Sequence, residues 1–133
     1  MKFALDKKDS YTVFSLLESK LNTLVAPDLK TELTILHNEG IRNIILDLEK
    51  VSFVDSSGLS AILVGNRLCS RSGGSLIVAA IADNVNRLFK ISQLDSVLTI
   101  IASVQQARDY VMMQELVNEL QDEEIADEGD AED

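Results

Sequence analysis

Apolar and polar residues alternate in blocks along the chain, and these blocks predict a series of strands and helices. Residues 2–6 and 11–17 are short apolar-rich runs, and the polar stretch "DKKDS" at 6–10 is typical of a hairpin turn. The following stretch "LESKLNTL", at 17–24, breaks the pattern and predicts a polar loop. We therefore expect the chain to begin with two antiparallel strands.

Helix signals appear in residues 26–40, "APDLKTELTILHNEG". Pro27 and Asp28 favour a helix start, and Gly40 stands where a C-terminal cap belongs. One apolar stripe at helical spacing predicts the buried face, and it consists of Leu29, Leu33 and Leu36.

The rest of the chain alternates between apolar runs typical of buried strands and helical patterns. The expected strands are 44–48, 75–81 and 96–101. The expected helices are 59–68, 82–92 with Asp83 as N-cap, and a last helix that starts at a Ser103–Gln106 capping box. We predict an α/β fold, a single domain with a mixed, mostly parallel β-sheet, an N-terminal hairpin and about four helices packed on it.

The net charge of −10 is concentrated near the C-terminus. Residues 121–133 hold eight acids and no base, whereas the rest of the chain carries 12 basic and 14 acidic side chains. A like-charge run is typical of disorder, so we expect a domain over residues 1–120 and an acidic, disordered tail over 121–133. Without a basic stripe, and with few aromatic residues, nucleic-acid binding is not expected.

No apolar run approaches the roughly 18 residues that span a bilayer, and the N-terminus lacks the apolar core of a signal peptide. Membrane insertion is therefore not expected. The single cysteine, Cys69, allows no intramolecular disulfide and fits the cytoplasm, which is the location we expect. A lone cysteine in an apolar helix is typical of a small buried residue.

The stretch "VSFVDSSGLSAIL", at 51–63, raises the main functional question. It begins as a short extended approach and ends as a helix, and between the two lie Asp55, Ser56, Ser57 and Gly58. In one interpretation Ser56 only caps the helix by accepting a backbone N–H bond, and Gly58 allows strand and helix to pack closely. In the other interpretation one of the serines is a site of chemistry.

A catalytic serine is not expected. The G-x-S-x-G pattern of hydrolases is absent, since Val54 stands where its first glycine belongs, and the only histidine, His37, lies on the first helix. No phosphate-binding glycine loop and no metal-ligand spacing occurs, so we expect no enzyme activity, no cofactor and no metal. A serine at an exposed helix start is nevertheless accessible to a kinase, and the helix dipole tolerates a phosphate there.

The segment "NIILDLEKVSFVDSSGLSAIL" resembles the STAS domain of bacterial anti-sigma factor antagonists. In that family a buried strand leads to D-S-[ST]-G-[LM] and a helix. The matching residues here are Asp55, Ser56, Ser57, Gly58 and Leu59. Residues 73–100 are similar to the strand, short helix and strand that follow in the family, and they match at Val85, Arg87, Leu88 and Phe89.

The resemblance implies a mechanism of partner switching. Family antagonists bind an anti-sigma factor that is a serine kinase of the GHKL type, and binding frees a sigma factor. The kinase phosphorylates the first serine after the aspartate, which dissociates the complex, and a PP2C-type phosphatase restores binding. The resemblance thus implies Ser56 as the phosphorylation site and Asp55, Ser57, Gly58 and Leu59 as partner-binding residues. ATP and Mg²⁺ would belong to the partner.

One loop departs from the family pattern. The family commonly reads G-E-[LI]-D where this chain has "SKLN", at 19–22. Lys20 replaces a glutamate and Asn22 an aspartate, so we expect both to influence partner choice. An alternative function is a STAS module of a transport system or signalling scaffold that has no phosphorylation switch, and an enzyme is a more distant alternative.

Overall fold

The computed structural model describes the backbone of residues 1–132 and the side chains of residues 1–123. Within this range five strands form a central sheet in the order β1-β2-β4-β6-β7, and two short strands form a separate ribbon, β3-β5. The strands are β1 (Phe3–Lys7), β2 (Thr12–Leu16), β3 (Lys20–Leu21), β4 (Ile44–Asp47), β5 (Phe53–Val54), β6 (Leu76–Ala79) and β7 (Thr99–Ile101). The helices are α1 (Ala26–Asn38), α2 (Ser56–Arg71), α3 (Asp83–Ile91), the 3₁₀ helix η1 (Leu94–Ser96) and α4 (Val104–Glu132).

The strand directions in the central sheet follow from the lengths of the connections. β1 and β2 are joined by a tight turn and pair antiparallel, with Phe3 opposite Leu16. The pairs β2–β4, β4–β6 and β6–β7 are parallel, and a helix lies between the strands of each pair along the chain. The predicted mixed, mostly parallel sheet with an N-terminal hairpin is confirmed.

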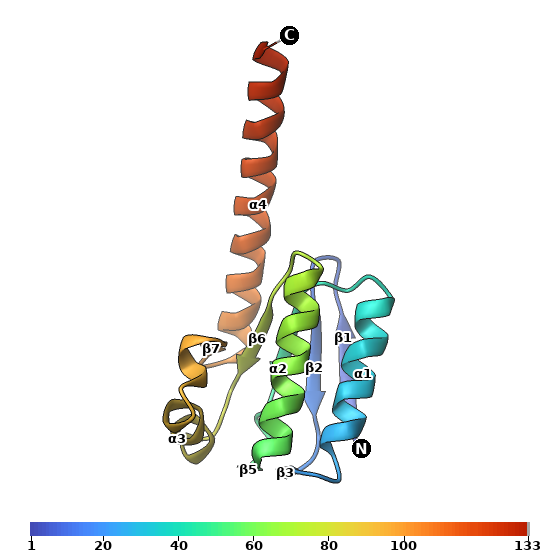
Figure 1. The fold of residues 1–133 in the computed structure, drawn as a ribbon, viewed down its shortest axis with the longest axis vertical. Coiled ribbons are helices and arrows are strands. Elements are labelled where there is room, and N and C mark those ends of the chain that lie inside the picture. Colours follow the sequence, from blue (N-terminus) through green and yellow to red (C-terminus); the bar gives the residue numbers. More distant parts are fainter. Residues whose placement is uncertain (133) are drawn as a thin grey trace.

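Helices cover both faces of the sheet, as Figure 1 shows. α1 and α2 pack against each other on one face, and α4 crosses β4, β6 and β7 on the other. Because side chains alternate along a strand, Ile44 and Leu46 of β4 join the cluster beneath α1 and α2, whereas Ile45 joins the cluster beneath α4. This double burial explains the continuous apolar run that predicted β4.

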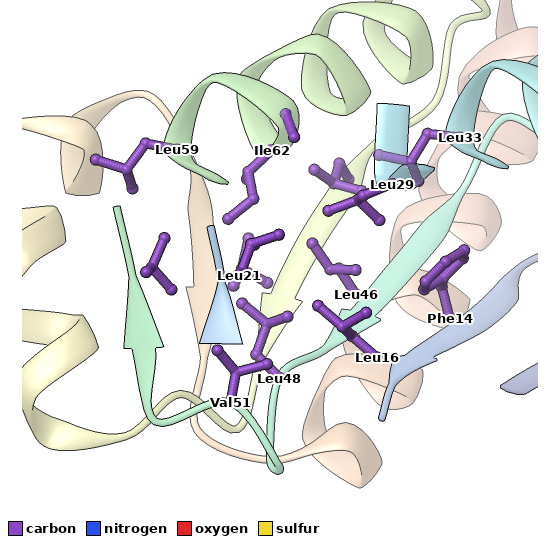
Figure 2. Packing of buried hydrophobic residues seen from close by; sticks show 14 of the residues in the cluster. Phe14, Leu16, Leu21, Leu29, Leu33, Leu46, Leu48, Val51, Leu59 and Ile62 are labelled. Carbon is purple, nitrogen blue, oxygen red and sulfur yellow. The ribbon is translucent and has the colours of Figure 1, made fainter. Parts of the chain in front are cut away.

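The larger cluster extends to the β3–β5 ribbon. Figure 2 shows Leu21 of β3 between Ile62 of α2 and Leu48, in the same cluster as Leu16 and Leu46 of the sheet. Leu21 is completely buried. The stretch predicted as a polar loop therefore contains a strand residue that is part of the core, and this residue ties the loop to the start of α2.

The helix boundaries agree with most of the predicted signals and differ at one. Pro27 occupies the first turn of α1, and Gly40 after its end has a φ of +90°, a conformation that glycine adopts without strain. Gln106 donates its backbone N–H to Ser103 Oγ at 3.1 Å, which is the predicted cap of α4. The prediction of Asp83 as N-cap is wrong, because Ala82 holds the extended capping position and Asp83 lies in the first turn of α3, where its charge favours the helix dipole.

Two polar contacts hold the first turns of α4 on the sheet. Arg108 donates to Asp6 Oδ2 and to Tyr11 Oη, each at 2.9 Å. Glu115 accepts from Arg42 Nη2 at 2.7 Å and from the buried Asn43 Nδ2 at 2.6 Å. The Asn43 amide has further partners, since Nδ2 donates to the Ser10 carbonyl and Oδ1 accepts from the Ser75 N–H. The Asn43 side chain, just before β4, thus joins the hairpin turn, the residue that precedes β6, and α4.

Beyond Glu115, α4 continues away from the sheet (Figure 1). Every described side chain from Leu116 to Glu123 is exposed. The helix runs to Glu132 and so includes most of the acidic segment that the sequence predicts to be disordered. Its first part is rich in helix formers, and Val104–Glu132 contains no proline. The boundary between a domain at 1–120 and a tail at 121–133 stays a prediction. Among the described residues, no helix combines the length and the apolarity required to cross a bilayer.

Deleting residues 122–133 is expected to leave the melting temperature within a few degrees of the full chain. The described side chains beyond Glu115 bury little surface, so the lost stability should be under about 1 kcal/mol. Thermal unfolding followed by circular dichroism measures the effect. A second deletion, of residues 112–133, removes the Glu115 contacts to Arg42 and Asn43 and should lower the melting temperature clearly more. Equal losses in the two variants would contradict the expected boundary.

Candidate functional site at the start of helix α2

The candidate site lies where β5 leads into α2, and β3 lies beside it. β3 and β5 pair parallel, with Lys20 opposite Phe53 and Leu21 opposite Val54. The Leu21 carbonyl also accepts the backbone N–H of Asp55 at 3.2 Å. The "SKLN" stretch therefore lies beside the segment that carries the serines, and main-chain hydrogen bonds hold it there.

Asp55 is the N-cap of α2. Its Oδ1 atom accepts hydrogen bonds from the Ser57 hydroxyl at 2.6 Å and from the backbone N–H of Gly58 at 3.0 Å. These hydrogen bonds, the one from Ser57 above all, lower the pKa of the Asp55 carboxyl below its usual value. The carboxylate is therefore ionised at neutral pH and places a fixed negative charge at the helix start. The interpretation of Ser56 as the helix cap is wrong, because Asp55 fills that role one residue earlier.

The two serines have different environments. The Ser57 hydroxyl donates inward to Asp55, and the side chain is half-buried. Ser56 is the first residue of α2 and is exposed, and its hydroxyl makes no hydrogen bond with another described residue. The hydroxyl of Ser56 is thus available to an external group, while that of Ser57 is engaged.

Gly58 allows β3 to approach the helix. A Cβ atom at this position would lie 2.5 Å from the Leu21 carbonyl oxygen and 2.9 Å from Val54 Cγ1, which are distances that real Cβ atoms do not adopt. The prediction that Gly58 permits close packing of strand and helix agrees with this geometry. Leu59 is 9% exposed and belongs to the core cluster (Figure 2). Both residues lie beneath the surface, because the N-terminal turn of α2 packs on β3 and β5, so they differ from the expectation of direct partner contact.

The two residues of the "SKLN" stretch with predicted roles also differ from each other. Lys20 is exposed and forms no ion pair with a described residue. Asn22 is half-buried, and its Oδ1 accepts the backbone N–H groups of Leu24 and Val25 at 3.1 and 3.3 Å. Asn22 therefore orders the turn that enters α1, whereas Lys20 presents a free ammonium group to solvent.

The structure adds two apolar residues to this surface. Phe53 is 48% exposed and lies beside Lys20 in the ribbon, and Leu24 is 83% exposed in the turn before α1. The sequence signal for Phe53 was its position next to the buried Val54, because neighbouring residues of a strand point to opposite sides. Exposed apolar side chains around a polar centre are typical of protein-binding surfaces.

Other reactive side chains do not complete a catalytic group with these serines. Burial raises the pKa of the Cys69 thiol to about 12, so this cysteine is the small buried residue that was predicted. His37 Nδ1 pairs with the Ser72 hydroxyl at 2.9 Å, just beyond the end of α2, whereas Ser56 is at its start. A helix of this length separates the two ends by about 24 Å, so His37 cannot act as a base for Ser56. Among the described residues no group of three metal-ligating side chains occurs.

The chain is similar to known proteins in sequence and in structure. The sequence model of the STAS domain matches residues 2–107. The anti-sigma-B factor antagonist of Staphylococcus aureus is 29% identical over 79 residues, which cover 59% of this chain and 73% of the relative. Such relatives are named for antagonism of anti-sigma factors, which is a regulatory binding function and not an enzymatic one.

Solved structures show the same fold. A candidate anti-sigma factor antagonist of Thermotoga maritima has a TM-score of 0.76 at 26% identity, covering 83% of this chain and 94% of that one. The Bacillus cell fate determinant SpoIIAA in its phosphorylated form has a TM-score of 0.66 at 23% identity, covering 83% and 99%. The murine anion transporter Slc26a9 has a TM-score of 0.65 at 16% identity, and the match covers 81% of this chain but 18% of the transporter.

Proposed function

Because the chain belongs to the STAS domain family, we propose that it is an anti-sigma factor antagonist that phosphorylation of Ser56 switches off. The observation that carries the proposal is the difference between the two serines. The Ser56 hydroxyl is exposed and unengaged at the first position of α2, beside the ionised Asp55, while the Ser57 hydroxyl is held by that carboxylate. The named relatives and the likeness to a phosphorylated antagonist support it.

In the proposed cycle the unphosphorylated chain binds a GHKL-type serine kinase that is also an anti-sigma factor, and this binding frees a sigma factor. The kinase supplies ATP, Mg²⁺ and the base that accepts the Ser56 hydroxyl proton. The chain contributes an acceptor hydroxyl in a fixed position, because the Asp55 cap and the β3–β5 ribbon order the first turn of α2. A PP2C-type phosphatase removes the phosphate and returns the chain to its binding state.

A phosphate on Ser56 would change the surface without unfolding the helix. It adds about −1.5 to −2 charges at pH 7 at a helix N-terminus, where the dipole favours anions. The added charge directly follows Asp55 in the chain, and Phe53 and Leu24 are exposed apolar side chains of the neighbouring ribbon and turn. A partner surface that packs on a neutral hydroxyl and on these apolar groups would meet an unpaired dianion, and the complex would dissociate.

Incubation with the kinase and ATP, followed by intact-mass measurement and site mapping, tests the proposal. Wild type and Ser57→Ala should each gain one phosphate on Ser56, the latter more slowly because Asp55 loses the Ser57 hydrogen bond. Ser56→Ala should gain none and should still bind the kinase. Full-rate phosphorylation of Ser56→Ala would show that the acceptor is elsewhere.

Lys20→Glu is expected to weaken binding to the native kinase by about tenfold or more without unfolding the chain. Lys20 is exposed next to Phe53, so the true partner should present an acidic or neutral patch to it, and a reversed charge there would be repelled. Calorimetric titration measures the affinity. Arg67→Glu is the matched control, since this exposed residue lies three turns along α2 from Ser56 and should not change it. An unchanged affinity of Lys20→Glu would remove the loop from the interface.

A second candidate function is a STAS module in a transport system or signalling scaffold without a phosphorylation switch. The likeness to part of an anion transporter favours it, although this likeness concerns the fold alone. Co-purification with a permease or a transport ATPase, together with equal partner affinity before and after phosphorylation, would support this function against the switch.

A further inference from the structure

The part of α4 beyond its anchor carries an apolar surface that the proposed switch does not use. Five side chains between Met112 and Leu120 are between 38% and 59% exposed: Met112, Met113, Leu116, Val117 and Leu120. Their spacing of one, three and four residues places them on one side of a helix. We call these five residues the α4 stripe.

The two edges of the α4 stripe differ in charge. At 3.6 residues per turn, Glu119 lies at the edge beside Met112, and Gln121 and Gln114 follow the other edge beyond Val117. Asn118 and Asp122 lie on the opposite side of the helix. An open hollow of about 520 Å³ lies at the base of the α4 stripe, and its lining consists of Ser10 of the β1–β2 turn, Asp109, Met112, Met113, Glu115, Leu116 and Glu119. The surface is therefore an apolar ridge with one acidic side and a notch at its base.

The negative charge of α4 favours some binding partners of the α4 stripe over others. Residues 109–133 contain eleven acids and no lysine, arginine or histidine. A second copy packed along the same ridge would bring these acids together without a compensating base, which disfavours self-association. An anionic membrane surface would be repelled for the same reason. A groove with basic residues on its rim complements both the ridge and its acidic edge.

We infer that the α4 stripe is a docking helix for a second protein, which presents an apolar groove with lysine or arginine along one rim. This surface is separate from the Ser56 surface. α2 begins at the end of the molecule where β3 and β5 lie, whereas α4 extends beyond the opposite end, on the other face of the sheet (Figure 1). Both surfaces are accessible at once, so the domain joins two partners. The inference is independent of the proposed function.

Site-specific photocrosslinking in the native host tests this inference. The full chain carries p-benzoylphenylalanine at Leu116 in the α4 stripe or, as a matched control, at Asn118 on the opposite side of the same helix. The expected result is an adduct to another protein from position 116 and not from 118, with the crosslink mapped to a groove that contains basic residues. No adduct from 116, equal adducts from both positions, or an adduct to a second copy would overturn the inference.

The captured protein is then purified and titrated with variants of the chain. Leu116→Gln with Leu120→Gln should lose affinity by about tenfold or more, since burial of such anchors dominates helix-in-groove binding. Glu119→Lys should also bind more weakly, and Asn118→Ala should bind as wild type does. Melting temperatures should stay unchanged, because these side chains are exposed. Unchanged affinity of the double variant would overturn the inference.

Ser56→Asp separates this inference from the proposed function, and it should bind the captured protein as tightly as wild type. Loss of that binding would assign the captured protein to the Ser56 surface and would overturn a separate docking helix. Conversely, a Ser56 that is never phosphorylated would leave the α4 result unaffected.

Discussion

Ser56→Asp is expected to reduce the affinity for the proposed anti-sigma kinase by about a thousandfold, equivalent to about 4 kcal/mol of binding free energy. The substitution places a carboxylate beside the ionised Asp55, at the position where the proposed partner would pack on a neutral, unengaged hydroxyl. Desolvation of an unpaired charge at an interface costs several kcal/mol. Titration of the purified kinase with wild type and variant gives the two dissociation constants.

Stability measurements separate a local effect of Ser56→Asp from unfolding. Ser56 occupies the first turn of α2, where an acidic residue favours the helix dipole, so the free energy of unfolding should change by about 1 kcal/mol or less. Ser56→Ala, which removes the hydroxyl without adding charge, should bind as wild type does. A Ser56→Asp variant that binds as tightly as wild type would show that the switch is not at this residue.

Gly58→Ala is expected to be the most destabilising single methyl addition in α2, at about 2–3 kcal/mol or roughly 10 °C in melting temperature. The new Cβ would meet the Leu21 carbonyl oxygen at 2.5 Å, and that oxygen is held by its hydrogen bond from Asp55. Either β3 or the first turn of α2 would have to shift. Denaturation in urea measures the loss.

Gly65→Ala in the same helix is the matched control. Its Cβ would contact Leu33 Cδ1 at 2.8 Å, but that atom is the end of a flexible side chain and the next neighbour is 3.6 Å away. Alanine also has a higher helix propensity than glycine by about 1 kcal/mol, which offsets part of the crowding. Gly65→Ala should therefore cost much less. Similar losses at both positions would show that the contact between Gly58 and β3 is not special.

The sequence predicted the strands and helices that are long enough to show a repeating apolar pattern. It did not predict which residue is the N-cap of α2. Asp55 and Ser56 are adjacent and both residue types cap helices well, so local preference does not choose between them. The pairing of β5 with β3 decides, because the bond from the Asp55 N–H to Leu21 sets where extended chain ends. The same reason applies to β3, since a two-residue strand is too short to show an alternating pattern.

The apolar pattern of the sequence also did not predict that the α4 stripe is exposed. The last helix was predicted, yet of its apolar residues from Val104 to Leu120 only Ala107 and Val111 are buried. The cause is a difference in length. β4 and β6 have four residues each and span about 13 Å. A helix of 29 residues is about 44 Å long, so α4 extends well beyond the sheet on which its first turns pack.

The β3–β5 ribbon also has a consequence for the order of folding. Ser56 receives its position from contacts with residues more than thirty positions earlier, through Leu21 and its bonds to the start of α2. Contacts of this sequence separation form only after the intervening chain, including α1 and β4, has closed into a loop. In a nascent or damaged chain Ser56 is present, but the ribbon that orders its position has not formed. A kinase that requires the ordered site would phosphorylate only folded molecules. Unfolded copies of the chain would then stay unphosphorylated.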